Sequence, residues 1–403
     1  MKLGENMDDV IIIGSGICGS TIFNELKKSF PEKKIRLIEK GNSPEYISEG
    51  KNVEIIHASS FGGAGMFSVG NAVRIDLPEF KISKKDKIYD EIERELNVSV
   101  IFEDSLNENL KKLLEMNFSM TPKFIDESTC SRCGLCAHVP CSSKWTPFNI
   151  LKTFENQVKM RHLKGDILKD IEVLRISKVG DVFSIIGLNK KTGEIKVFES
   201  KKVVISAGGV NSPRILKTIS KNEHVGKNLF VDTFVTVGGI LKDCNLNSDV
   251  QMIVHKKYQD FIIAPHYSEL LYGRISKFQK VDKKDVFGLM VKINDDNSGE
   301  VLENSVIKEM TMNDTQKLSE GVIKASKYLY DLGLENIYST IPRGSHPGGT
   351  CALDKVVDKN LETEIKNLYV CDASVIPNAV GAPPILGLIA ISKKFSQNLK
   401  NSF

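Results

Sequence analysis

The sequence predicts an α/β fold in which a Rossmann-type nucleotide-binding domain is joined to a second domain with an antiparallel sheet. Two observations carry this prediction. A glycine-rich turn, Gly14–Gly19, separates the apolar run Val10–Ile13 from a helical stretch that ends near Ser29, the order of a strand, turn and helix that bind a dinucleotide. Farther along, residues 231–294 contain short β-like runs separated by polar residues, which is typical of antiparallel strands.

The composition is that of an ordinary globular protein. The chain has 403 residues, 41% hydrophobic and 26% charged, which allows two domains. Its 55 basic residues are scattered among 51 acidic ones, for a net charge of +4, so a nucleic-acid partner is not expected. No run reaches the roughly 18 apolar residues of a transmembrane segment, and residues 1–9 lack the features of a signal peptide. We therefore expect a cytoplasmic protein, of oligomeric state that the sequence leaves open.

The glycine turn has the spacing that a bound pyrophosphate requires. Gly14 permits the tight turn, Gly16 lets the backbone approach the phosphates, and Gly19 allows the helix to pack closely on the strand. The start of that helix offers free N–H groups to the phosphates. Glu39 follows the second apolar run, residues 35–38, twenty residues after Gly19. Its carboxylate would accept hydrogen bonds from a ribose diol, which favours FAD or NAD over a 2′-phosphorylated cofactor.

Four of the eight cysteines are clustered at Cys130, Cys133, Cys136 and Cys141. Because the chain carries no export signal, this cluster indicates metal before disulfide bonds. The spacing of the first three is that of thiolates around one iron–sulfur cluster, with Cys141 as the expected fourth ligand of a 4Fe–4S cluster. A zinc site is the main alternative, although zinc usually takes two cysteine pairs from separated turns, and free thiols are another. The remaining cysteines stand singly and are expected to be buried thiols: Cys18, Cys244, Cys351 and Cys371.

Several motifs resemble those of the glucose–methanol–choline (GMC) oxidoreductases. The segment 344–351, GSHPGGTC, resembles the signature around the family's catalytic histidine, and residues 356–358 and 367–377 continue that pattern. Residues 209–216 are similar to the second family signature, and residues 62–71 to the glycine-rich loop that contacts the flavin. The resemblance therefore extends along the whole chain.

This resemblance implies an FAD-binding domain built from three separated stretches, residues 1–80, 160–230 and 345–403. An insertion with the cysteine cluster would occupy residues 81–159. A substrate domain would occupy residues 231–344, with its antiparallel sheet over the isoalloxazine ring of FAD.

The FAD contacts that the glycine turn and the resemblance imply lie on several motifs far apart in the chain. They are Gly14, Gly16, Gly19, Glu39, Gly63, Asn71, Ala207, Gly208, Asp372, Ala373, Pro384 and Ile385. By this resemblance, Asp372 and Ala373 lie beside the flavin phosphates and ring. The N-terminus of the last helix would point at the pyrimidine edge of the ring, where its partial positive charge stabilises the anionic reduced flavin.

The resemblance assigns the catalytic role to His346, whose neutral imidazole would take a hydroxyl proton. The family pairs this histidine with a second His or Asn. At that position the chain has Pro383, whose side chain neither donates nor accepts a hydrogen bond, and Asn378 is offset from it. The chain is also shorter than most relatives, which indicates that elements covering the substrate are reduced.

These features together predict an FAD-dependent dehydrogenase that exchanges hydride with a small hydroxylated or carbonyl substrate. Electrons would pass through the iron–sulfur cluster to a ferredoxin-like carrier or a partner subunit. Two alternatives remain. One is a ferredoxin-fed reductase of a carbonyl or activated double bond, and the other is an electron-transfer subunit without substrate chemistry. The presence of His346 argues against the second, because an electron-transfer subunit needs no base beside the flavin.

Overall fold

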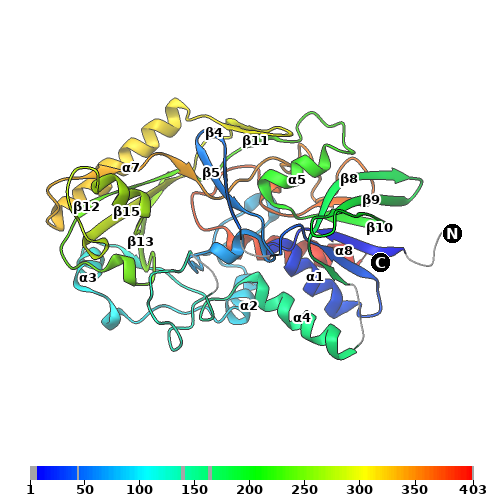
Figure 1. Cartoon of the computed structure of the whole chain (residues 1–403), viewed down its shortest axis with the longest axis horizontal. Coiled ribbons are helices and arrows are strands. Elements are labelled where there is room, and N and C mark those ends of the chain that lie inside the picture. Colours follow the sequence, from blue (N-terminus) through cyan, green and yellow to red (C-terminus); the bar gives the residue numbers. More distant parts are fainter. Residues whose placement is uncertain (1–6, 43–44, 138–140, 162–165, 402–403) are drawn as a thin grey trace.

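A computed structural model describes residues 7–42, 45–137, 141–161 and 166–401 of the chain. Two large sheets lie at opposite ends of an elongated molecule. Figure 1 shows the sheet that contains β1 and β8 to β10 on the right, and the sheet that contains β12 and β15 on the left. This arrangement of mixed sheets and helices confirms the predicted α/β fold.

The first sheet has seven strands in the order β7-β2-β1-β10-β9-β8, with β20 also paired to β10. Their bounds are β1 Asp8–Ile13, β2 Ile35–Ile38, β7 Ile167–Leu168, β8 Ile171–Val179, β9 Val182–Asn189, β10 Ile195–Ile205 and β20 Leu368–Val370. Strand β1 runs parallel to β2 and β10, and β20 runs parallel to β10. The carboxyl ends of these parallel strands therefore meet at one edge, where nucleotides bind in α/β sheets.

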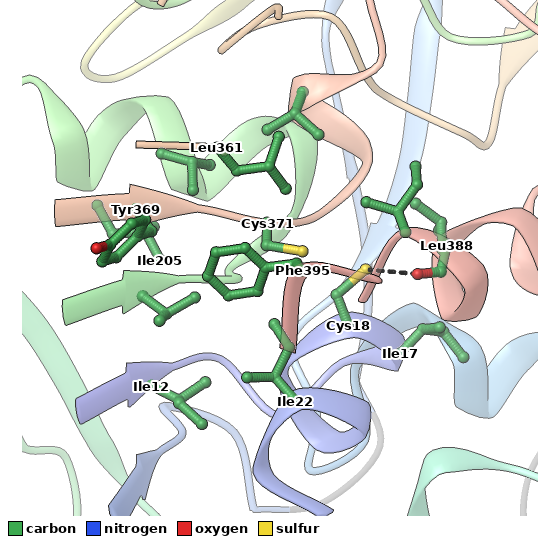
Figure 2. Close-up of a cluster of buried hydrophobic side chains, with 14 of the residues drawn as sticks. Ile12, Ile17, Cys18, Ile22, Ile205, Leu361, Tyr369, Cys371, Leu388 and Phe395 are labelled. Atoms are coloured by element: carbon green, nitrogen blue, oxygen red, sulfur yellow. Dashed lines mark hydrogen bonds between the residues drawn. The ribbon is translucent and has the colours of Figure 1, made fainter. Parts of the chain in front are cut away.

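Two helices pack against each other beside this sheet, α1 (Ile17–Ser29) and α8 (Ile385–Lys400). In Figure 2, Cys18 and Cys371 lie among apolar side chains, and the Cys18 thiol donates to the carbonyl of Leu388 over 3.7 Å. Both thiols are buried in the core, and Cys244 and Cys351 are buried as well. The four single cysteines are thus buried side chains, as expected.

The second sheet has nine strands in the order β3-β5-β19-β12-β15-β14-β13-β6, with β18 also paired to β12. Their bounds are β3 Tyr46–Glu49, β5 Glu54–Ala58, β6 Ser119–Met120, β12 Phe234–Ile240, β13 Val254–Lys257, β14 Phe261–Pro265, β15 Val286–Ile293, β18 Tyr338–Ser339 and β19 Arg343–Gly344. Strands β12 to β15 pair antiparallel, which confirms the antiparallel sheet predicted for this region. Strands β3 and β5 come from the first 80 residues, so that stretch contributes to both large sheets.

Helix α7 (Met312–Asp331) covers the second sheet. It begins with a capping box, in which Thr311 accepts from the backbone N–H of Asp314 and the Asp314 carboxylate accepts from that of Thr311. Gly321 allows α7 to lie close to β15, because a Cβ at this position would be 2.3 Å from the side chain of Val291.

The remaining elements connect or extend the two sheets. They are β4 Lys51–Asn52, β11 Lys227–Leu229, β16 Gly299–Val301 and β17 Val306–Lys308, which form a four-stranded sheet, and the helices α2 Lys87–Glu95, α3 Glu108–Glu115, α4 Pro147–Arg161, α5 Gly208–Leu216 and α6 Glu269–Ile275. Within the described ranges, no helix combines the length and apolar character required to cross a bilayer.

A buried ion pair joins the end of β15 to the four-stranded sheet. Lys308 is fully buried, and its ammonium lies 2.8 Å from the carboxylate of Asp295. That carboxylate also accepts the backbone N–H groups of Val231 and Thr233, each over 3.1 Å. Burial raises the pKa of Asp295, while the charge of Lys308 opposes the rise. The pair therefore fixes the backbone on both sides of Asp232.

Removal of the cation should destabilise the fold. Lys308→Met leaves Asp295 charged and buried without its partner, which typically costs about 3–5 kcal/mol of unfolding free energy. Urea unfolding followed by circular dichroism measures this cost. Lys283→Met is the matched control, because Lys283 pairs with Glu269 at the surface and its loss should leave the midpoint nearly unchanged. Equal urea midpoints for the two variants would contradict the stabilising role of the Lys308–Asp295 pair.

Candidate active site

A cavity of about 500 Å³ is lined by residues from both large sheets. Twelve of the thirteen flavin-contact and catalytic residues expected from the sequence lie on its wall. They are Gly14, Gly16, Glu39, Gly63, Asn71, Ala207, Gly208, His346, Asp372, Ala373, Pro384 and Ile385. The exception is Gly19, for which the sequence predicts packing of the helix on the strand.

The glycine turn has the geometry that its spacing predicts. Gly14 has a φ of +102°, and a Cβ there would lie 2.3 Å from the carbonyl oxygen of Ser206. A Cβ on Gly19 would lie 1.9 Å from the Gly14 oxygen, so the close packing of α1 needs a glycine. At Gly16 the nearest atom to a Cβ is 4.0 Å away, on Gly63. A side chain at Gly16 would thus stand in the cavity, in front of the uncapped N-terminus of α1.

Glu39 is buried at the carboxyl end of β2 and is held by three donors. One carboxylate oxygen accepts the backbone N–H and the hydroxyl of Ser15, over 2.8 and 2.7 Å, and the other accepts the N–H of Gly41 over 2.8 Å. Burial raises the pKa of Glu39, and these hydrogen bonds oppose the rise. A carboxylate has about four acceptor positions, so a position remains for a ribose hydroxyl. The residues present therefore fit the adenosine end of FAD.

Asp372 joins the end of β20 to the start of α5. One of its oxygens accepts the N–H of Gly208 over 2.8 Å and the hydroxyl of Ser212. The other accepts the N–H of Ser374 over 2.8 Å. Gly208 has a φ of +84°, with open space where a Cβ would stand. Asp372 thereby fixes a backbone turn that borders the cavity, next to Ala373.

Two loops that border the cavity contribute backbone and short side chains. A Cβ on Gly63 would lie 2.8 Å from the Cα of Gly16, so the glycine-rich loop touches the dinucleotide turn. Asn71 lines the cavity, and its side-chain oxygen accepts a hydrogen bond from the buried ammonium of Lys123. Helix α8 begins at Ile385 without a side-chain cap, so its N-terminal N–H groups are available at the cavity wall.

His346 is held by a carboxylate that the sequence analysis did not identify. Its Nδ1 lies 2.9 Å from Oδ2 of Asp232, whose other oxygen accepts the N–H of Gly381 over 3.1 Å. Because a carboxylate oxygen accepts, Nδ1 carries the proton of the neutral imidazole and Nε2 is the basic nitrogen. Burial and the charge of Lys292 lower the pKa of His346, while Asp232 opposes them. The imidazole is therefore neutral at neutral pH, as proton abstraction requires.

Lys292 is the second residue that sequence reasoning missed. Its ammonium lies 3.0 Å from the Ser345 hydroxyl and 3.3 Å from Nδ1 of His346, and its side chain lines the cavity. Burial lowers its pKa to about 8, against the opposing charges of Asp232 and Asp295. The available signal was a single cation inside the apolar run VFGLMVKI.

The two residues considered at the position of the family's second catalytic side chain lie apart. Pro383 lines the cavity, which agrees with its placement in the family pattern. Asn378 instead accepts a hydrogen bond from Asn297 at the surface, over 3.2 Å. Asn378 therefore makes its contact outside the cavity.

The clustered cysteines lie on one loop, with Cys130 and Cys141 partly buried, Cys133 exposed and Cys136 buried. Burial raises the pKa of Cys130, and the charges of the other three thiols add to the rise. Gly134 has a φ of +74°, and a Cβ there would overlap the carbonyl of Asn247.

The loop is attached to the cavity wall. The ammonium of Lys144 donates to the carbonyls of Cys136, Ser68 and Met66, and Ala137 lines the cavity. In the part of the chain that the structure describes, no three His, Cys, Asp or Glu side chains are arranged to hold a metal ion. The four thiols therefore do not form a ready-made ligand shell.

Comparison with known proteins identifies the family. Two models described as GMC oxidoreductase match residues 72–234 and 297–392. The chain belongs to the GMC oxidoreductase family. It is an FAD-dependent oxidoreductase of the kind that acts on CH–OH groups. The resemblance stated from the motifs is confirmed.

The relatives span both well-matched and distant proteins. An uncharacterised protein of Methanocaldococcus jannaschii is 46% identical over 98% of this chain and 100% of that protein. The long-chain-alcohol oxidase FAO4B of Arabidopsis thaliana is 22% identical over 52% of this chain and 38% of its own length. Pyridoxine 4-oxidase from Mesorbium loti has a TM-score of 0.73 at 15% identity, covering 98% of this chain and 99% of its own. Formate oxidase of Aspergillus oryzae has a TM-score of 0.74 at 14% identity, covering 100% and 99%. The two structures share the fold.

A side chain at Gly16 should block the cofactor without disturbing the fold. Gly16→Val should weaken FAD binding by about 10-fold or more, because overpacking of this kind costs roughly 1–3 kcal/mol. Isothermal titration of apoprotein with FAD measures the change. Gly273→Val is the control, since a Cβ at Gly273 meets no atom within 4 Å and lies outside the cavity. Unchanged FAD affinity in Gly16→Val would show that the pyrophosphate does not bind at Gly16.

Proposed function

We propose that this enzyme is a dehydrogenase that exchanges hydride with a small hydroxylated or carbonyl substrate, with His346 as its catalytic base. The observation that carries the proposal is that one cavity is lined by the glycine turn, by Glu39 and by His346, which is hydrogen-bonded to Asp232. A cofactor that binds at the glycine turn and Glu39 can thus present its reactive end to His346.

The proposed FAD site uses backbone donors and one carboxylate. Gly14, Gly16 and the N-terminus of α1 would receive the pyrophosphate, and Glu39 would accept the ribose hydroxyls. The N-terminus of α8 would face the pyrimidine edge of the ring. The remaining proposed contacts come from the loops that line the same cavity: Gly63, Asn71, Ala207, Gly208, Asp372, Ala373, Pro384 and Ile385. Bound FAD supplies the hydride acceptor or donor.

The proposed division into domains follows from these contacts. The FAD-binding domain would comprise residues 1–80, 160–230 and 345–403, and the substrate domain residues 231–344. The loop of clustered cysteines lies in the insertion, residues 81–159. Support comes from the first sheet, because all seven of its strands fall within the three stretches assigned to the FAD-binding domain.

His346 would move the substrate proton. In oxidation, Nε2 takes the proton of the substrate hydroxyl, and in carbonyl reduction it returns that proton. Asp232 keeps the proton of neutral His346 on Nδ1 and stabilises the imidazolium that forms. The same groups serve both directions, so the ferredoxin-fed reductase stays an alternative. An electron-transfer subunit would have no use for this pair.

We further propose that Cys130, Cys133, Cys136 and Cys141 bind a 4Fe–4S cluster. The support is the donor set, four thiols on one loop, and the attachment of that loop to the cavity wall. Burial raises the pKa of Cys130, and the charges of the other three thiols add to the rise. Ligand shells of this kind form when the metal binds. The cluster would supply a one-electron centre near the flavin for a ferredoxin-like carrier or partner subunit. Zinc is the alternative occupant.

Loss of one proposed ligand tests the cluster. Cys133→Ser, purified without oxygen, should lose iron and sulfide and keep its FAD, because the flavin contacts lie on other segments. Iron and sulfide assays with visible absorption measure both cofactors. Cys244→Ser is the control, since its buried thiol donates to the carbonyl of Lys284, and it should keep its iron. Wild-type protein with stoichiometric zinc and no sulfide would contradict the proposal.

Loss of the base tests the chemistry. His346→Ala should slow flavin reduction by about 10²–10⁴-fold, the usual contribution of a positioned acid or base, while FAD content stays unchanged. Anaerobic stopped-flow absorption with an alcohol found by screening measures the rate. His224→Ala is the control, because His224 is exposed. Equal rates for wild type and His346→Ala would remove His346 from the reaction.

A further inference from the structure

Lys292 is a buried cation at a position where packing alone does not require one. It lies near the end of β15, every residue of which is buried. Burial of an ammonium without full compensation is costly. The acidic groups that face it are Asp232 and Asp295, and they act through charge at longer range. Among the described residues, no carboxylate forms an ion pair with it within 4 Å.

The hydrogen bonds around Lys292 leave its ammonium with donors to spare. An ammonium has three N–H donors and no acceptor. The Ser345 hydroxyl accepts one over 3.0 Å. Nδ1 of His346 lies 3.3 Å away, but it carries a proton and donates to Asp232. The side chain also lines the cavity, so an oxygen atom inside the cavity can accept the remaining donors.

We propose that Lys292 is the second catalytic group of this site and performs the work for which Pro383 has no suitable side chain. Its ammonium donates a hydrogen bond to the substrate oxygen while Nε2 of His346 takes the proton from that oxygen. Negative charge that develops on the oxygen is then stabilised by the adjacent cation. The inference rests on the proposed dehydrogenase function, and in the reverse direction the same contact polarises a carbonyl.

The surrounding groups set the pH range of this contact. The pKa of Lys292 is about 8, so its ammonium is charged below pH 8 and loses a proton above pH 8. The titratable neighbours are His346 and His266, and burial followed by the charge of Lys292 lowers the pKa of His266 to about 4. Both imidazoles are therefore neutral between pH 7 and 9, where Lys292 titrates.

The remaining wall near Lys292 indicates the substrate class. Phe234, Met252 and Met290 line the cavity together with the polar Thr236, His266 and Arg343, and the ring of Phe234 lies 5.2 Å from the Lys292 ammonium. We therefore expect a substrate with one reactive oxygen, as in an alcohol or its carbonyl product, and an apolar portion that contacts Phe234.

Sulfite, an anion that adds to the reactive edge of flavins, tests the proposal without a substrate. Wild-type holoenzyme and the variants Lys292→Met and Lys292→Arg are titrated with sulfite, and the loss of flavin absorbance gives Kd. Lys292→Met should weaken binding by about 10- to 100-fold, the range of a charge-assisted hydrogen bond. Lys292→Arg should bind within a few-fold of wild type. Lys317→Met is the matched control, because Lys317 donates to the carbonyl of Asn294 outside the cavity.

The pH dependence separates a catalytic from a structural role. The sulfite affinity of the wild-type protein should fall as the pH rises through about 8. This fall with pH should be absent in Lys292→Met, and absent up to pH 10 in Lys292→Arg. If Lys292 only held Ser345 in place, the fall of sulfite affinity with pH would persist in both variants, and the proposal would be wrong.

FAD content is measured first in every variant. Wild-type protein that binds no FAD would refute the proposed function itself. A Lys292→Met variant with FAD and with wild-type sulfite affinity would refute only the role of Lys292. If Lys292→Met does not fold, Lys292→Gln, which removes the charge and retains a polar donor, is expected to show the same loss of affinity and of the pH component.

Discussion

The Asp232 carboxylate accepts hydrogen bonds from His346 and from the backbone of Gly381, and the geometry of the site depends on this double contact. Asp232 itself has a left-handed backbone, with a φ of +50°, a conformation that aspartate adopts more readily than most residues with a side chain. That backbone is held by Asp295, which accepts the N–H groups on either side and is paired with Lys308. A buried ion pair behind the cavity wall thus helps to orient the His346 imidazole.

The same constraint explains how this chain departs from its family. The loop that carries Pro383 contributes a backbone N–H to Asp232 through Gly381, so it supports the histidine through main-chain contacts. The ammonium of Lys292, on β15, lies 3.3 Å from Nδ1 of this histidine. Burial keeps the imidazole neutral and lowers the pKa of Lys292 toward the working range of an enzyme. Pro383 and Lys292 thus both line the cavity that contains His346.

The sequence predicted those features whose cause is local. A Cβ at Gly14 or Gly19 would overlap backbone atoms, whereas a side chain at Gly16 would stand in the cavity. The spacing of these three glycines alone indicates a dinucleotide turn. The antiparallel strands follow from the short β-like runs of residues 231–294. His346 was found because its motif is continuous.

Features that depend on distant contacts were not predictable in this way. Asp232 lies 114 residues before His346, and nothing in the local sequence distinguishes it from a surface aspartate. Lys292 was overlooked because a cation in an apolar strand acquires meaning only when its neighbours are known. The cysteine spacing predicts a cluster, but the described side chains are not arranged to hold a metal ion, and ligand shells of this kind form only when a metal binds.

In the proposed enzyme, one cofactor extends from Glu39 to His346 within a single cavity. A crystal structure of the protein saturated with FAD tests this claim most directly. We expect the adenosine ribose against the Glu39 carboxylate, with the flavin ring beside Nε2 of His346 and the ammonium of Lys292. A structure in which FAD binds elsewhere, or in which its ring lies away from His346, would contradict the account.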